Sequence, residues 1–254
     1  MRSITLMFAV VLLLAGADES LADPKAGEVK LFAGMPFVWV PGGTFQMGCG
    51  AWTSECFAWE KPVHPVTLSG FWLGKSEVTQ GQWKATMGAN PSKSTDCGNN
   101  CPVERVSWED VQEFIKKLNA RDGKFRLPTE AEWEYACRSG GKAEHFAGGK
   151  KEGQVAWYQG NSGNKTHQVG TKAPNGLGLV DMSGNIWEWV QDWFAEDAYA
   201  KHDSKGQYTG SGTDRVVRGG CWGSVAAGVR CSYRYHLLPG NRNRNLGVRL
   251  ARSP

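Results

Sequence analysis

The sequence predicts a loop-rich α+β fold with small sheets and few helices. Three observations support this: helix-capping patterns occur at only three places, the strand-like runs are short, and the chain combines 33 glycines with 12 tryptophans. Large aromatic side chains can anchor long loops, because their burial offsets the entropy lost on ordering. Few helices and many loops indicate a small sheet core rather than a doubly wound parallel sheet.

Three helix starts follow the capping-box pattern, in which a Ser or Thr precedes an acidic residue or Gln by three positions. They are Thr79 with Gln82, Ser107 with Asp110, and Thr129 with Glu132. The second predicted helix also has an apolar face at helical spacing. That face consists of Val111, Phe114, Ile115 and Leu118, and the helix is expected to end within 119–123.

Short apolar runs predict strands in the first part of the chain. Residues 37–40 and 44–47 are expected to form a hairpin around Pro41-Gly42-Gly43, and residues 66–68 and 71–73 a second hairpin. Residues 143–176 show almost no periodicity and are predicted to be mainly loop.

The first residues have the build of a secretory signal peptide. Arg2 precedes an apolar and small run at 4–17, shorter than the roughly 20 residues that span a bilayer. Ser20-Leu21-Ala22 places small residues where a signal peptidase reads them, so we expect 1–22 to be removed. A buried N-terminal helix is the alternative. No cysteine follows the run, so we expect a periplasmic or secreted protein without a lipid anchor.

Residues 23–254 are long enough to bury a sizeable core and contain no linker-like stretch, which predicts a single domain. No later segment is apolar enough to enter a membrane, and we expect a monomer. The net charge of +4 is too small to indicate nucleic-acid binding.

The positive charge is unevenly distributed. Residues 215–254 contain eight arginines and no Asp or Glu. These arginines could form a patch for an anionic or carbonyl-rich ligand. We favour the other interpretation, that they pair with carboxylates elsewhere in the domain, because Arg is the usual partner of semi-buried carboxylates.

Seven cysteines in an exported chain indicate disulfides first. Cys49 with Cys56 and Cys97 with Cys101 can each close a local loop. A bridge from Cys137 to Cys231 would join the middle of the chain to its end and stabilise the fold by roughly 4 kcal/mol in the loop-entropy model. Cys221 is then unpaired. A zinc site at Cys97 and Cys101 is a weaker alternative, because no second ligand pair has comparable spacing.

Three ordered segments resemble the signature of the formylglycine-generating enzyme family, also called sulfatase-modifying factors. They are FRLPTEAEWEYA at 125–136, GLVDMSGNIWEW at 178–189 with DW at 192–193, and RVVRGGCW at 215–222 followed by RC at 230–231 and NLGVRL at 245–250. Upstream, residues 37–48 and 76–79 resemble the family's opening strands and first helix start. The resemblance covers nearly the whole chain after residue 22. It implies a complex α+β fold related to C-type lectins, and it implies the bridge between Cys137 and Cys231.

The resemblance also implies a structural calcium ion in the loop around residues 181–188. The matching positions are Asp181, Gly184, Ile186 and Glu188. Two carboxylates and two backbone carbonyls form the hard oxygen set that calcium prefers. The alternative is a helix cap with Glu188 turned to solvent.

The copper chemistry of the family has no counterpart in the residues. Members that oxidise a substrate cysteine bind copper through two cysteines after the Gly-Gly segment, because soft thiolates hold Cu(I). Here Ser224 stands at the first ligand position, and 225–230 is shorter than its counterpart and contains no cysteine. We therefore do not expect copper.

Cys221 stands at the family's active-site serine position. It is a candidate catalytic thiol, and the alternative is a small buried residue, the commoner fate of an unpaired cysteine. Trp187, Trp222 and Arg234 are expected to line the same groove, for stacking and for binding a carboxylate or peptide carbonyl. The five histidines include no pair at ligand spacing.

Two functions compete. The first is an exported relative that still modifies a peptide, protein or natural product, and Cys221 and the arginine-rich groove would form its active site. The second is a lectin-like binding or structural module that has lost the catalyst. Sulfatase activation through a formylglycine oxidase ranks below both, because the copper thiols are missing.

Overall fold

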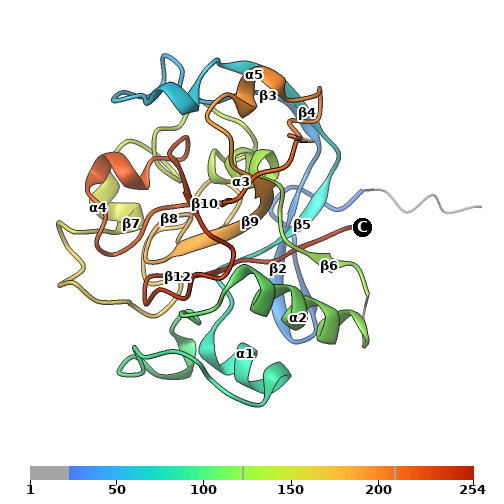
Figure 1. Ribbon diagram of the computed structural model, residues 1–254, viewed down its shortest axis with the longest axis vertical. Helices are drawn as coiled ribbons and strands as arrows, with labels where there is room; N and C mark the ends of the chain where they lie inside the picture. Colours follow the sequence, from blue (N-terminus) through green and yellow to red (C-terminus); the bar gives the residue numbers. More distant parts are fainter. Residues whose placement is uncertain (1–22, 122, 209) are drawn as a thin grey trace, which may run out of the picture.

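Residues 23–121, 123–208 and 210–254 are described by a computed structural model (Figure 1). The predicted signal peptide lies outside these residues. The strands are β1 (Val29–Phe32), β2 (Met35–Val40), β3 (Gly43–Met47), β4 (His64–Leu68), β5 (Phe71–Gly74), β6 (Phe125–Arg126), β7 (Ala156–Trp157), β8 (Ser183–Gly184), β9 (Trp187–Trp193), β10 (Arg215–Arg218), β11 (Arg234–Leu237), β12 (Leu246–Val248) and β13 (Ala251–Arg252). The α-helices are α1 (Gln80–Met87), α2 (Trp108–Asn119), α3 (Glu130–Cys137), α4 (Glu152–Val155) and α5 (Ala198–Lys201), with 3₁₀ turns η1 (Ala58–Glu60), η2 (Gly98–Asn100) and η3 (Ala226–Val229).

All three predicted capping boxes are present. In α1, α2 and α3 the N-cap side chain accepts from the N3 backbone N–H, and the N3 side chain accepts from the N-cap backbone N–H. The apolar face of α2 is buried as predicted, and it packs in a core with Trp189 and Val217. These starts depend on contacts three residues apart, which explains why the sequence alone predicts them.

A long antiparallel ribbon replaces the two predicted hairpins. β2 pairs with β5, and β3 pairs with β4, in one continuing register: Val40 lies opposite Phe71, and Gly43 opposite Leu68. The predicted hairpins are wrong, although the strands lie close to where they were expected. Pro41 and Gly42 interrupt the ladder instead of reversing the chain. A Cβ on Gly42 would lie 2.7 Å from the Leu68 carbonyl oxygen, so the two chains remain in close contact there.

Two larger sheets organise the molecule. One has the order β1-β2-β5-β13-β6, with the C-terminal strand β13 antiparallel to both β5 and β6. The other has the order β11-β10-β9-β12, in which β12 runs parallel to β9. Figure 1 shows the red C-terminal end of the chain returning to the blue and cyan strands of the first half. The second sheet therefore brings the 187–193, 215–218 and 246–248 segments side by side.

The small sheets, few helices and long loops confirm the predicted α+β class. Two fully buried tryptophans belong to the cores, Trp133 of helix α3 to one core and Trp189 of strand β9 to the other. The three predicted disulfides are all present, each with a Cα–Cα distance of 5.7 Å. Across the described ranges, no helix has the length and apolar character needed to cross a membrane.

Candidate functional site

Cys221 follows β10 directly, where Gly219 and Gly220 redirect the chain. Both glycines have positive φ, 90° and 73°, which other residues rarely adopt. The turn buries Cys221, which is 3% exposed. Its Sγ accepts a hydrogen bond from the Asn245 side-chain amide at 3.2 Å and lies 3.4 Å from the Ser224 hydroxyl oxygen. The structure thus brings together the two predicted residues Cys221 and Ser224, with Asn245 as a partner that the sequence did not indicate.

No second thiol accompanies Cys221. All seven cysteines lie within the described residues, and six are joined as Cys49–Cys56, Cys97–Cys101 and Cys137–Cys231. Around Cys221 the partners are a hydroxyl and a carboxamide, which are hard, neutral groups. Cu(I) prefers soft thiolates, so this set does not fit the copper centre of the copper-dependent family members.

Of the predicted tryptophans, Trp222 follows Cys221 in the chain, and Trp187 is bonded to Asn245, the residue whose amide contacts Cys221. The Trp187 backbone N–H donates to the Asn245 carbonyl at 2.8 Å, and the Trp222 N–H donates to the Asn185 carbonyl at 2.8 Å. Trp222 is buried, and the Arg244 guanidinium lies 5.0 Å from its ring centroid. Trp187 is only partly buried, and it leads to an aromatic surface.

That surface, here called the aromatic strip, consists of Phe57, Trp59, Trp187, Tyr233 and Tyr235. Their rings contact in sequence: Trp59 stacks on Phe57 at 4.9 Å, and Phe57 meets Tyr233 at 5.6 Å. Trp187 lies 6.0 Å from Tyr233 and 5.6 Å from Tyr235. Phe57 and Tyr235 are 40% and 43% exposed. The other three rings are half-buried, and a run of contacting aromatic rings that reaches the surface in this way is typical of an interaction site.

The prediction that Arg234 lines the groove is wrong. Arg234 is fully buried, and its Nε and Nη2 donate to the two carboxylate oxygens of Glu130 at 2.7 and 2.8 Å. Burial opposes ionisation of Glu130, but the Arg234 and Arg218 guanidinium groups outweigh it and lower the Glu130 pKa. Side chains alternate sides along an extended chain, so Tyr235 is exposed and Tyr233, just before β11, is half-buried where Arg234 between them is fully buried.

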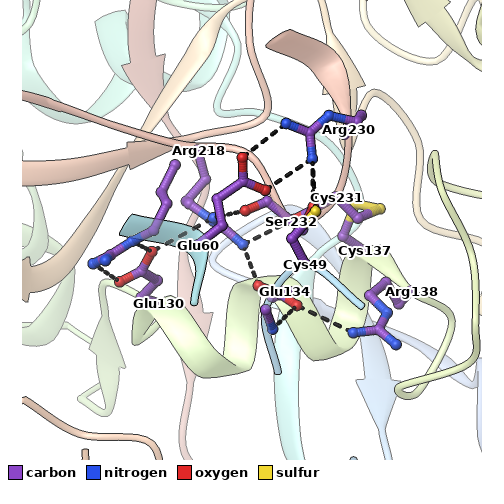
Figure 2. A network of polar contacts seen from close by, with 12 residues as sticks. Cys49, Glu60, Glu130, Glu134, Cys137, Arg138, Arg218, Arg230, Cys231 and Ser232 are labelled. Carbon is purple, nitrogen blue, oxygen red and sulfur yellow. Dashed lines mark hydrogen bonds and ion pairs between the residues drawn. A yellow bond between two sulfur atoms is a disulfide. The ribbon is translucent and has the colours of Figure 1, made fainter. Parts of the chain in front are cut away.

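A buried network of ion pairs and hydrogen bonds, drawn in Figure 2, supports the segment that carries Phe57 and Trp59. Arg230 donates to both oxygens of Glu60 at 2.8 Å, which fixes the loop that carries Phe57 and Trp59. Glu134 accepts from Arg218 at 2.6 Å, from Arg138 at 3.1 Å, and from the Gly48 backbone N–H at 2.8 Å. The Cys137–Cys231 disulfide lies beside these pairs. The network therefore joins α3, β10 and the 48–60 loop.

Most of the C-terminal arginines pair with carboxylates, as predicted. The pairs are Arg218 with Glu130 and Glu134, Arg230 with Glu60, Arg234 with Glu130, Arg242 with Asp110, and Arg249 with Glu188. Most of these arginines therefore stabilise the fold, and they do not form a free anionic-ligand patch.

The predicted calcium residues lie together in a buried region, but Glu188 is already engaged. Its carboxylate accepts from Arg249 at 2.7 Å and from the Trp133 indole N–H at 2.6 Å. Asp181 Oδ2 accepts from the Gly170 N–H at 2.6 Å, while its Oδ1 is buried without a partner. A cation would find Asp181 Oδ1 available but would compete with Arg249 for Glu188. Calcium binding here stays a prediction.

Glu77 belongs to the same region and was not predicted as a site residue. Its Oε1 accepts from the Asn185 side-chain amide at 3.1 Å, and its Oε2 is buried without a partner. Burial raises the Glu77 pKa well above its usual range, and the charge of Asp181 adds to this. Burial likewise raises the Asp181 pKa to about 6. In the described part of the chain, no three His, Cys, Asp or Glu side chains converge as a metal site.

Two histidines far apart in sequence form a contact that spacing could not predict. His64 Nε2 and His202 Nδ1 are 3.0 Å apart, and His64 Nδ1 lies 3.0 Å from the Pro62 carbonyl oxygen. Burial lowers the His202 pKa to about 4. Both rings pack against Tyr199, at centroid distances of 5.0 Å for His64 and 4.9 Å for His202.

Comparison with known proteins agrees with the family resemblance of the sequence motifs. The family model described as sulfatase-modifying factor enzyme 1-like domain matches residues 23–254. Chaperone protein LppX of Paenibacillus barcinonensis is 31% identical, over 85% of this chain and 89% of that protein. The formylglycine-generating enzyme of Mus musculus is 36% identical over 73% of this chain, but the match spans only 52% of that enzyme.

The structure is also similar to that of PvdO from Pseudomonas aeruginosa. The TM-score is 0.81 at 27% identity, over 91% of this chain and all of PvdO. A likeness of this extent agrees with the fold that the sequence motifs imply.

Proposed function

This chain belongs to the family of sulfatase-modifying factor enzyme 1-like domains, and we propose that it acts as an exported polypeptide-binding protein rather than as a copper-dependent oxidase. The observation that carries the proposal is the aromatic strip. Its rings are exposed or half-buried although they come from three separate parts of the chain, and buried ion pairs hold the segments that carry them. Rigid aromatic side chains bind with little loss of entropy, which is why they dominate protein interfaces.

Oxidase chemistry is disfavoured by the environment of Cys221. Its six potential thiol partners are in disulfides, and its contacts are the neutral Ser224 and Asn245 side chains. No carboxylate or imidazole forms a hydrogen bond with Sγ among the described residues, so no general base is placed to activate the thiol. Binding by the aromatic strip therefore explains the surface better than catalysis by Cys221 does.

The name of LppX gives a further reason to favour a polypeptide partner. A chaperone binds other polypeptide chains, and the match to LppX extends over 89% of that protein. Exposed aromatic rings are suited to unfolded or extended segments, because such segments present apolar side chains that stack without requiring one fixed shape.

Binding of a reduced, chemically unfolded model protein tests the proposal. Replacing Trp187 or Tyr235 by Ser is expected to weaken capture about tenfold or more, since central aromatic residues contribute the largest share of interface affinity. Leu31→Ser is the matched control, because Leu31 is also exposed but lies on edge strand β1, away from the strip. Cys221→Ser should bind as the wild type does.

Two results would overturn the proposal. Equal capture by the strip variants and by Leu31→Ser would show that the strip is not the binding surface. Stoichiometric, tight Cu(I) binding by the fully oxidised protein, lost in Cys221→Ser, would restore the oxidase interpretation.

A further inference from the structure

A pocket lies at the opposite end of β10 from Cys221 and belongs to no predicted site. Its volume is about 420 Å³, and its walls include Asp192 and Trp193 at the end of β9 and Arg215 at the start of β10. Thr129, the N-cap of α3, and Gln191 complete this part of the wall. Two of these side chains are charged and almost fully buried, which is unusual unless each has a partner.

Arg215 is held rigidly but lacks a carboxylate. Its guanidinium lies between the rings of Trp108 and Trp193, 4.0 and 3.4 Å from their centroids. Nη1 donates to the Gln191 carbonyl at 2.6 Å. Nε is buried without a partner, and Nη2 forms no hydrogen bond within the described ranges, although the residue is only 9% exposed. The two ring contacts fix the plane of the guanidinium and leave its Nε–Nη2 edge unused.

The same edge binds carboxylates elsewhere in this protein. Arg234 uses Nε and Nη2 to grip Glu130, and Arg249 uses them to grip Glu188. This paired geometry is the preferred way for Arg to hold a carboxylate. Arg215 therefore presents a ready-made carboxylate site, but the described residues place no carboxylate within ion-pair distance of it.

Asp192 has the opposite deficiency. Its Oδ2 accepts from the Glu130 backbone N–H at 2.7 Å, which fixes the carboxyl at the start of α3. Its Oδ1 forms no hydrogen bond within 23–121, 123–208 and 210–254, and the residue is 8% exposed. Burial raises the Asp192 pKa to about 7, and the charge of Glu130 adds to this. A cation beside Oδ1 would offset the free-energy cost of burying the ionised carboxylate.

We propose that the pocket binds a free α-amino acid, with its carboxylate on Arg215 and its ammonium group on Asp192. The two charges of an α-amino acid are attached to one carbon, and the pocket offers two opposite charges that do not pair with each other. A ligand with only a carboxylate would leave the charge of Asp192 without a cation. A ligand with only an amine would leave the charge of Arg215 without an anion. The volume leaves room for a side chain beyond the two charged groups. This proposal does not depend on the function assigned to the aromatic strip.

The first experiment uses the wild-type protein alone. The full set of free L-amino acids is screened by nuclear magnetic resonance, and the best binder is titrated calorimetrically beside its N-acetyl and carboxamide derivatives. Each derivative removes one charge, so each is expected to bind about tenfold or more weakly than the parent. Derivatives that bind as tightly as the parent, or a screen with no binder at millimolar concentration, would refute the proposal.

Two variants locate the site. Asp192→Asn keeps an oxygen for the Glu130 N–H and removes the charge, and Arg215→Lys keeps the charge and removes the paired geometry. Both are expected to lose at least about tenfold in affinity. Glu113→Gln and Arg242→Lys are the matched controls on the exposed surface. Equal affinity in all four variants would place the ligand elsewhere and overturn the assignment.

Discussion

The buried carboxylate of Glu134 gives the sharpest test of how the aromatic strip is supported. Glu134→Gln keeps the size of the side chain and removes its charge. The native carboxylate is an acceptor for Arg218 at 2.6 Å, for Arg138 at 3.1 Å and for the Gly48 N–H at 2.8 Å. A glutamine must turn its NH₂ group toward at least one of these donors, which leaves two donors facing each other.

The expected cost follows from the burial of the group. Breaking a buried ion pair by removing one partner typically costs about 3–5 kcal/mol. Arg218 retains Glu130 at 3.5 Å and the Ser232 and Cys231 carbonyls, which places the loss near the lower end, about 3 kcal/mol. A domain is stabilised by only about 5–15 kcal/mol, so the loss is a large fraction of the total.

Urea unfolding of the oxidised protein, followed by tryptophan fluorescence, measures this loss. Glu113→Gln is the control, because Glu113 is exposed and its one ion pair among the described residues is with Lys116 at 3.5 Å. The control is expected to stay within about 0.5 kcal/mol of the wild type. A Glu134→Gln variant that loses less than about 1 kcal/mol would refute the reasoning that charge in this network stabilises the fold.

Three further results are expected. Burial lowers the His202 pKa to about 4, helped by His64 and opposed by Glu130. The free energy of unfolding should therefore be highest above the unfolded His pKa of about 6.5 and fall by about 1–3 kcal/mol as the pH drops toward 4. His202→Asn should show a smaller fall over this pH range, and identical pH profiles of the two proteins would contradict the reasoning. Removing the Cys137–Cys231 disulfide by a double Ser substitution should cost about 4 kcal/mol in urea unfolding, because it closes a loop of 94 residues; a loss below about 1 kcal/mol would contradict the estimate. Chelation of calcium should lower the thermal midpoint of the wild type but not of Asp181→Asn, and no difference would eliminate the calcium prediction.

Several features of the fold and site could be predicted from residues close together in the chain. The capping pairs Thr79–Gln82 and Thr129–Glu132 act over three positions, so their effect does not depend on the rest of the molecule. The absence of a cysteine from residues 222–230, after Cys221, is also visible in the local sequence. For this reason the sequence alone predicts the α+β class and the lack of a thiol pair for copper.

The pairing of the strands and the individual carboxylate partners of the arginines were decided by the tertiary structure. Local turn signals favoured hairpins at 37–47 and 66–73, but β2 pairs with β5 inside the five-stranded sheet and β3 pairs with β4. The sequence allows many pairings between its eight C-terminal arginines and the carboxylates of the chain. The folded arrangement, with the sheet order β11-β10-β9-β12, pairs Arg234 with Glu130 and gives Arg215 no ion-pair partner among the described residues. Hydrogen bonds and ion pairs act over a few ångströms, so residues distant in sequence acquire partners only when the chain has folded.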